Sequence, residues 1–172
     1  MKNIPIILGT ALLSVLLGCA SAPVAIAPVG PNPVGARVVS AEGGLRVYSC
    51  LEAQSDDQNQ GGFDNPDWYQ HTDYDIYARN GTLVKHVGNS IGHYEQTPRL
   101  VSLPAGQYYV KARAADYMWV KVPVTIKRGL ITKVHLDDQW MPPTDIASRQ
   151  VVSLPNGKPV GWRLTYGNKT TR

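Results

Sequence analysis

Short runs in which apolar and polar residues alternate recur along the chain. Within 107–113, Tyr108, Val110 and Ala112 are spaced two residues apart, and polar side chains or tyrosine lie between them. A period of two is typical of a β-strand that buries one face. The same spacing recurs at 45–51, 120–126 and 130–136, and two further runs, 74–79 and 82–87, are rich in β-prone residues. We therefore expect a succession of short strands and no amphipathic helix.

Turn residues separate these runs at intervals of about 8 to 12 residues. Asn80-Gly81 is the strongest short hairpin signal, because both residues tolerate a positive φ. Pro104-Ala105-Gly106 and Lys127-Arg128-Gly129 mark two more turns. Pro123 lies on the outward side of its run and cannot donate to a sheet ladder, so we expect that strand at an edge. The pattern predicts an all-β fold, an antiparallel β-sandwich, over residues 37–140.

The last part of the chain, 141–172, has a pattern of its own. Met141-Pro142-Pro143 is typical of a linker, and two apolar runs, 150–154 and 159–166, follow it. The turn sequence Pro155-Asn156-Gly157-Lys158 lies between these runs and predicts a β-hairpin. Two placements stay open, since the hairpin can pack on the sandwich or offer an edge to a partner strand.

The N-terminus has the layout of a secretory signal. Lys2 precedes an apolar run from Ile4 to Leu17, and Leu16-Leu17-Gly18-Cys19 ends the segment. These four residues resemble the bacterial lipobox. The resemblance implies that residues 1–18 are removed, that the Cys19 sulfur carries a diacylglyceryl group and that the new amino terminus is acylated. Ala20 stands where an aspartate marks inner-membrane retention in such proteins, which favours the outer membrane.

Two other interpretations of this segment are an uncleaved membrane anchor and a signal cut at Ala20 or Ala22. The apolar run covers about 14 residues, fewer than the roughly 20 that span a bilayer, and Pro5 interrupts it. Stable anchoring takes more than one acyl chain, and the lipobox resemblance implies three. Residues 19–36 then form a proline-rich stretch without charge, which predicts an extended tether of roughly 50 Å.

A second resemblance rests on two stretches of the β-rich region. The first begins with Leu103-Pro104-Ala105-Gly106 and continues into Tyr108-Tyr109-Val110, and the second places Gly129 before Thr132-Lys133-Val134-His135-Leu136. Together they resemble the repeat of carboxypeptidase regulatory-like and PEGA-type domains, in which a Pro-x-Gly turn starts one strand and a later glycine turn starts another. The resemblance covers roughly 45–137. It implies a prealbumin-like sandwich of seven strands, in a class of domains that act as spacers, adhesion modules and binding units.

Charge and cysteine content narrow the choice of partners. The net charge is +4, but the basic residues are scattered through strand-like segments without a dense run, so we expect no nucleic acid partner. A basic face toward anionic lipid stays open, because the anchor would hold the domain near a membrane. The chain has two cysteines, so Cys50 lacks a partner if Cys19 carries lipid. We expect Cys50 to pack as a small apolar residue.

Three patterns raise the question of catalysis or metal binding. Gly88-Asn89-Ser90-Ile91-Gly92 fits the G-x-S-x-G expression of a nucleophile elbow, which requires a parallel strand before it and a helix after it. Asp56, Asp57 and Asn59 could supply oxygen ligands to calcium, although later ligands of an EF-hand loop are missing. The four histidines, His71, His86, His93 and His135, lack zinc-site spacing. We therefore expect no cofactor, no metal and no catalytic set.

Aromatic residues around the long polar loop 54–71 are the best candidates for a binding surface. The candidates are Phe63, Trp68, Tyr69, Tyr74 and, near another strand junction, Trp119. Exposed tryptophan and tyrosine rings stack on ligands and dominate interfaces, although in a small sandwich they can instead fill the core. We predict a non-enzymatic envelope lipoprotein that binds a protein or a glycan. The alternative is an accessory enzyme that acts on envelope polysaccharide or peptidoglycan through Ser90 or the acidic loop.

Overall fold

The computed structural model describes residues 26–32, 41–53, 69–91, 96–145 and 148–164. These residues form an all-β fold with a turn of 3₁₀-helix at Ser148–Gln150. The strands are β1 (Val29–Gly30), β2 (Gly43–Tyr48), β3 (Leu51–Ala53), β4 (Tyr69–His71), β5 (Tyr74–Ala78), β6 (Leu83–Val87), β7 (Leu100–Leu103), β8 (Gly106–Ala114), β9 (Tyr117–Ile126), β10 (Ile131–His135), β11 (Val151–Ser153) and β12 (Pro159–Arg163). The described residues contain no helix of the length and apolarity that crossing a bilayer requires.

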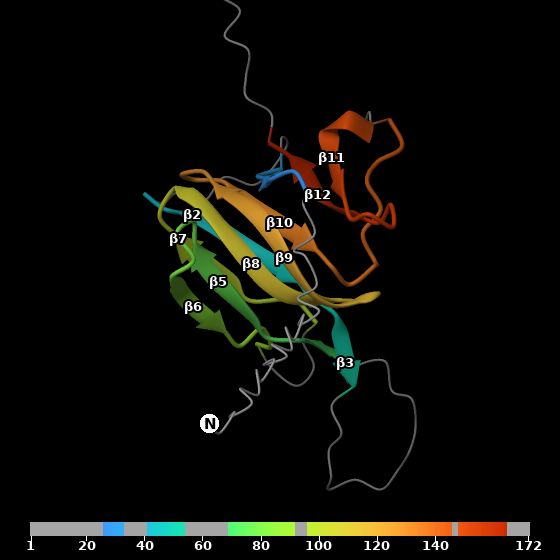
Figure 1. Ribbon diagram of the computed structural model, residues 1–172, viewed down its shortest axis with the longest axis horizontal. Helices are drawn as coiled ribbons and strands as arrows, with labels where there is room; N and C mark the ends of the chain where they lie inside the picture. Colours follow the sequence, from blue (N-terminus) through green and yellow to red (C-terminus); the bar gives the residue numbers. More distant parts are fainter. Residues whose placement is uncertain (1–25, 33–40, 54–68, 92–95, 146–147, 165–172) are drawn as a thin grey trace, which may run out of the picture.

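The strands pair in one large sheet and two smaller ones. Seven strands follow the order β11-β12-β1-β9-β8-β5-β6, three follow the order β10-β2-β7, and β3 pairs with β4 at one end of the molecule (Figure 1). Most neighbours are antiparallel, but β1 with β9 and β2 with β10 are parallel, so the prediction of a purely antiparallel fold is wrong. Neither parallel pair is joined by a tight turn, and only a tight turn forces adjacent strands to run in opposite directions.

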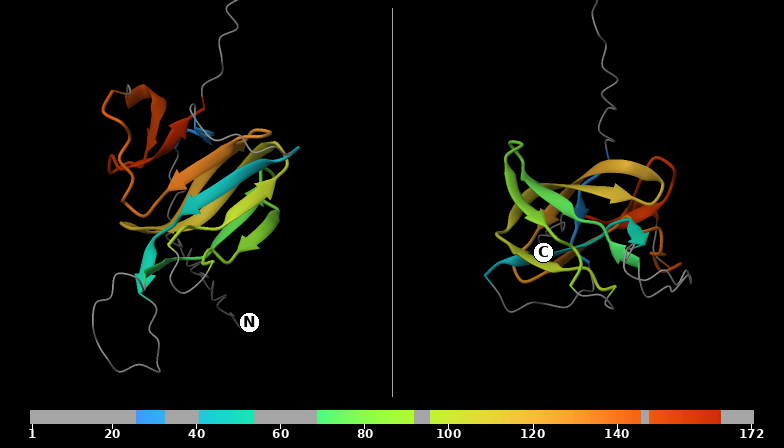
Figure 2. Two further views of the ribbon diagram at one scale, coloured as in Figure 1. Left: turned by 180° about the vertical axis from the view of Figure 1, so that it is seen from behind. Right: turned by 90° about the horizontal axis from the view of Figure 1, so that it is seen from below.

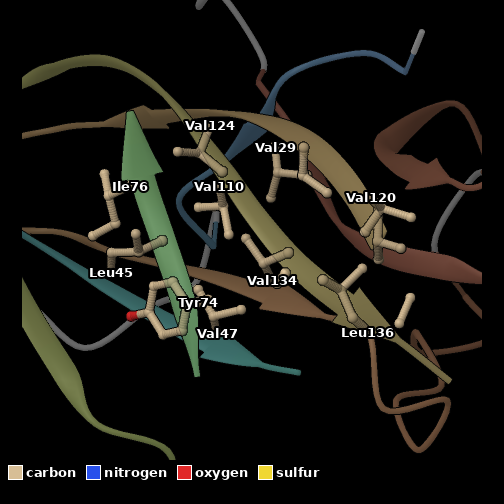
Figure 3. Packing of buried hydrophobic residues seen from close by; sticks show 14 of the residues in the cluster. Val29, Leu45, Val47, Tyr74, Ile76, Val110, Val120, Val124, Val134 and Leu136 are labelled. Atoms are coloured by element: carbon tan, nitrogen blue, oxygen red, sulfur yellow. The ribbon is translucent and has the colours of Figure 1, made fainter. Parts of the chain in front are cut away.

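The apolar core lies where the three-stranded sheet faces the seven-stranded one. Seen from behind, β10, β2 and β7 lie side by side in front of the larger sheet (Figure 2). Val110 and Val124 point into the core from the larger sheet, and Leu45, Val47 and Val134 from the smaller one (Figure 3). All five are almost completely buried, as the alternation in the sequence predicted. Full burial of such a side chain contributes about 1.5–3 kcal/mol.

The turn predictions have mixed outcomes. The hairpin at Asn80-Gly81 is confirmed, because β5 and β6 pair on either side of it and Gly81 has a φ of 88°. The prediction that Pro123 marks an edge strand is wrong, since β9 lies between β8 and β1. β1 is so short that it pairs with β9 at Val124 only, and Pro123 therefore needs no donor on that side.

β1 lies in the stretch that was predicted to be a free tether. Val29 is completely buried, and it pairs with Arg163 of β12 on one side and Val124 of β9 on the other. The predicted tether, 19–36, therefore contains a strand of the main sheet. Hydrophobic periodicity could not predict this strand, because two residues are too few to show a period and only one of them carries a side chain.

The predicted C-terminal hairpin is confirmed as β11 and β12. β12 pairs with β1, so the hairpin extends the seven-stranded sheet, and β11 forms one edge of that sheet (Figure 1). Lys158 in the hairpin turn forms ion pairs with Asp116 and Asp138, which join the turn to the β8–β9 connection and to the segment after β10. The segment predicted as a linker and hairpin, 141–172, thus contributes two strands to the same sheet as the residues before it.

Candidate functional site

The structure describes three of the five aromatic residues predicted to form a binding surface. Tyr69 begins β4 and is half-buried, Tyr74 begins β5, and Trp119 in β9 is 52% exposed. The other predicted site residues lie outside the described part of the chain: Phe63, Trp68, the lipidation site Cys19, and the calcium candidates Asp56, Asp57 and Asn59.

Tyr74 is a core residue, so its assignment to a binding surface is wrong. Its side chain is 1% exposed and lies among the buried valines (Figure 3), and burial raises the pKa of its hydroxyl well above the ordinary value. The alternation along β5 explains this placement. Tyr74 and Ile76 point inward, whereas Asp75 and Tyr77 between and beyond them remain partly exposed.

Trp119 borders a cavity of about 420 Å³ near the paired strands β3 and β4. The lining residues come from β3, β4, the β4–β5 turn, the loop after β6, β8 and β9. They are Glu52, Gln70, His71, Thr72, Asp73, Ser90, Arg113 and Trp119. This volume falls within the range of small-molecule sites, and most of the lining side chains are polar or charged.

A buried polar network holds one wall of the cavity in place. Asn89 is completely buried, and its Nδ2 donates to the Val47 carbonyl at 2.9 Å and to Ser49 Oγ at 3.0 Å. Ser49 Oγ donates to the Thr72 carbonyl at 2.5 Å. His71 Nδ1 lies 2.6 Å from the Ser49 carbonyl, and since a carbonyl only accepts, Nδ1 carries a proton there. In the neutral form of the ring the lone pair is then on Nε2. The network joins the end of β2 to the β4–β5 turn and to the loop after β6.

The charged groups at the rim of the cavity are paired with one another or with neighbours. Arg113 of β8 forms an ion pair with Glu52 of β3. One carboxylate oxygen of Asp73 accepts a backbone hydrogen bond at 3.0 Å from the loop after β6, and the other lies 3.7 Å from His86 Nε2. A hydrogen bond to Asp75, followed by the charges of Asp75 and Asp73, raises the pKa of His86. The rim therefore presents both donors and acceptors.

Behind His71, a stack of rings runs away from the cavity. The Tyr48 ring meets His71 edge-on at 5.6 Å and stacks on His135 at 4.4 Å, and His135 stacks in turn on Trp140 at 4.8 Å. Burial, together with the charges of Lys133 and His71, lowers the pKa of His135 to about 4. This stack was not predicted from the sequence, because Tyr48 and His135 meet only through the pairing of β2 with β10.

The remaining candidates for catalysis and metal binding are the G-x-S-x-G segment, Cys50 and the clusters of potential metal ligands. The G-x-S-x-G segment follows β6, which is antiparallel to β5 and differs from the parallel strand of a nucleophile elbow. Ser90 nevertheless lines the cavity together with His71. Cys50 is half-buried, and its Sγ donates to the Leu51 carbonyl at 3.5 Å. Within the described ranges, no three His, Cys, Asp or Glu side chains come together as a metal site.

The fold and the cavity define an all-β protein with a polar, ligand-sized hollow beside a half-exposed tryptophan. Comparisons of the chain with protein-family models, with curated proteins and with solved structures found no match.

Proposed function

We propose that the protein is a non-enzymatic envelope lipoprotein whose β-sandwich binds a glycan in the cavity beside Trp119. A β-sandwich is supported by the single apolar core, to which the seven-stranded sheet and the three-stranded sheet both contribute side chains. The N-terminal sequence supports a lipid anchor on Cys19 and a place at the outer membrane. The observation that carries the binding role is the cavity, in which a half-exposed indole lies beside charged and polar side chains.

The lining of the cavity matches a sugar chemically. The C–H faces of a sugar ring are apolar and pack on an aromatic ring such as Trp119, whereas its hydroxyls both donate and accept hydrogen bonds. Glu52 and Asp73 can accept from such hydroxyls, and Arg113 can donate. A lipid tail in the same place would remove these groups from water without new partners, which costs about 1–3 kcal/mol for each group.

The position of β1 sets how far the domain can stand from its anchor. If Cys19 carries the lipid, the chain reaches the main sheet at Val29 after a short segment, 20–28. Even fully extended, this segment spans at most about 32 Å, against roughly 50 Å for the predicted tether. The intact mass of protein purified from membranes tests the anchor. A mass that starts at Met1, or that lacks added hydrocarbon, would overturn it.

Binding measurements on the mature domain test the cavity. We expect purified peptidoglycan or soluble chito-oligosaccharides to bind, and Trp119→Ala to weaken binding about 3- to 10-fold because the ring contact is lost. Met141→Ala is the matched control, since Met141 is 86% exposed and does not line the cavity. Unchanged affinity in Trp119→Ala would contradict the proposal. So would capture of an envelope protein by a domain that binds no glycan.

A second candidate function has one observation in its favour, which is that Ser90 and His71 line the same cavity. In this alternative the protein is an accessory enzyme that hydrolyses an ester or amide bond in envelope polysaccharide or peptidoglycan. His71 Nε2 would take the proton of Ser90 as it attacks the carbonyl carbon and return it to the leaving alcohol or amine, and water would then release the acyl group. Release of soluble fragments from peptidoglycan by the wild-type domain, abolished in Ser90→Ala, would establish it. Equal amounts of fragments from both proteins would remove it.

A further inference from the structure

The outward side of β5, β8 and β9, called the outer face below, is continuous with the cavity. Ala112, Ala114 and Val120 are buried, so the residues next to them, Arg113 and Trp119, point outward. These two residues also line the cavity. A ligand bound in the cavity can therefore extend onto the outer face without crossing a barrier.

Two lysines lie directly opposite each other on the outer face. The strand register pairs Lys111 of β8 with Lys121 of β9, and like charges at opposite positions destabilise a sheet. Each ammonium group lies over a ring of the neighbouring strand: Lys111 Nζ is 5.3 Å from the centre of Trp119, and Lys121 Nζ is 4.5 Å from the centre of Tyr109. In the described part of the chain neither lysine forms an ion pair with a carboxylate. Two like charges placed opposite each other lower the stability of the sheet, and arrangements that lower stability in this way are expected at functional sites.

A row of apolar and aromatic side chains crosses the outer face beside the lysine pair. Tyr109 lies opposite Tyr77 of β5, and Tyr77 lies opposite Leu83 of β6, which is 52% exposed. Neighbouring strands are about 4.8 Å apart, so these side chains follow one another at short, regular intervals. One carboxylate also lies on the outer face: Asp75 of β5 is opposite Lys111 in the register, but it binds His86 and the Tyr77 hydroxyl instead. The outer face thus combines an apolar row with two cations that form no ion pair within the described chain.

We propose that the outer face binds an acidic glycan chain whose first sugar occupies the cavity. This inference rests on the proposed function and adds the class of ligand and the path it follows. The Trp119 ring contacts the sugar at the cavity, and the rings of Tyr109 and Tyr77 contact sugars further along the chain. The two lysines lie between these contacts and form ion pairs with acidic groups of the ligand. The ligand brings the negative charge that the lysine pair lacks.

The placement of the tyrosines favours a glycan over an anionic membrane. Tyr77 and Tyr109 are half-buried, and the Tyr77 hydroxyl donates to Asp75 at 3.3 Å. These rings are held against the sheet, whereas side chains that anchor a protein in a bilayer penetrate several ångströms into the headgroup region. A flat surface of this kind suits a ligand that lies along it.

Two sets of oligosaccharides of equal length test the inference on the mature domain. Hyaluronan fragments alternate glucuronic acid and N-acetylglucosamine, and chito-oligosaccharides carry N-acetylglucosamine alone. We expect hyaluronan octasaccharides to bind more tightly than chito-octasaccharides at about 0.15 M salt, and the difference to disappear near 1 M. Lys121→Gln should weaken hyaluronan binding about 3- to 5-fold, leave chito-oligosaccharide binding unchanged, and be rescued by Lys121→Arg.

Lys85→Gln is the matched control. Lys85 pairs with the inward-facing Ile76 and so lies on the opposite side of the sheet, and its loss should change neither affinity. Equal binding of the two octasaccharides, or an equal effect of Lys85→Gln and Lys121→Gln, would overturn the inference and leave the cavity proposal intact. If the wild-type domain binds neither octasaccharide, both the inference and the cavity proposal are overturned. Lysine-dependent binding to phosphatidylglycerol vesicles, without hyaluronan binding, would assign the face to a membrane.

Discussion

At the residue scale, His135 shows how burial and stacking alter the chemistry of one side chain. Its ring lies between Tyr48 and Trp140, and its pKa falls from the ordinary 6.5 to about 4. The folded protein therefore stays neutral at this site over a pH range in which the unfolded chain binds a proton. Because the unfolded chain binds this proton more readily, protonation lowers the free energy of unfolding. This contribution to stability is fully present above about pH 6.5 and is lost as the pH falls through about 4.

We expect His135→Phe to make the free energy of unfolding depend less on pH below about pH 7. Phenylalanine keeps a ring between Tyr48 and Trp140 but cannot take up a proton. Between about pH 7 and pH 4, the free energy of unfolding should fall more in the wild type than in the variant, by a difference on the order of 2 kcal/mol after allowance for partial exposure. Urea titrations at several pH values measure this difference. Parallel profiles would show that His135 does not titrate as its setting implies.

At the scale of elements, β1 depends on a close approach that a glycine permits. A Cβ on Gly161 of β12 would lie 2.6 Å from Val29 Cγ1 and 2.9 Å from the Lys133 carbonyl oxygen. Both distances are too short for real atoms, and one of them involves backbone. The absence of a side chain at Gly161 is therefore what lets Val29 reach the core beside β12.

Gly161→Ala should destabilise the protein by about 1–3 kcal/mol, because β1 or β10 must shift to admit the methyl group. Gly88→Ala is the matched control. A Cβ there would meet nothing closer than Asp73 Oδ1 at 4.0 Å, so we expect a change within about 0.5 kcal/mol. Thermal or urea unfolding of the two variants provides the comparison. Similar midpoints for both would mean that β1 does not need the close approach.

Sequence reasoning succeeded where the relevant neighbours are local. Alternation identified the inward valines of β8 and β9, and Asn80-Gly81 identified a hairpin whose strands adjoin it in sequence. It failed for β1, whose partners lie more than 90 residues away. Tyr74 was misassigned because its closeness to the loop aromatics was given more weight than its phase in β5. Trp119 was found, but Asn89 was not, since a buried polar residue leaves no periodic signal.

At the scale of the whole molecule, the two ends of the described chain hold each other in place. β1 supplies the partner of β12, and the β11–β12 hairpin has no other strand to join it to the seven-stranded sheet in the described residues. A chain that begins at Pro33 should therefore lose both Val29 from the core and the strand that pairs the hairpin with the main sheet.

A chain that begins at Ile26 should keep the stability of the mature domain, whereas one that begins at Pro33 should have a Tm lower by about 10 °C or fail to fold. The reason is the loss of one fully buried valine and of the backbone pairing on both sides of β1. Calorimetry of the two shortened proteins gives the comparison. Equal Tm values would show that β1 contributes nothing to the sheet.

The pairing of β1 with β12 also has a consequence for biosynthesis. Val29 and Arg163 are more than 130 residues apart, so the ribosome releases the first strand long before the strand that must lie beside it. The large sheet cannot be completed before β12 has been synthesised, and contacts of such long range form slowly. Until that strand is made, β1 can pair only with β9, at the single position Val124.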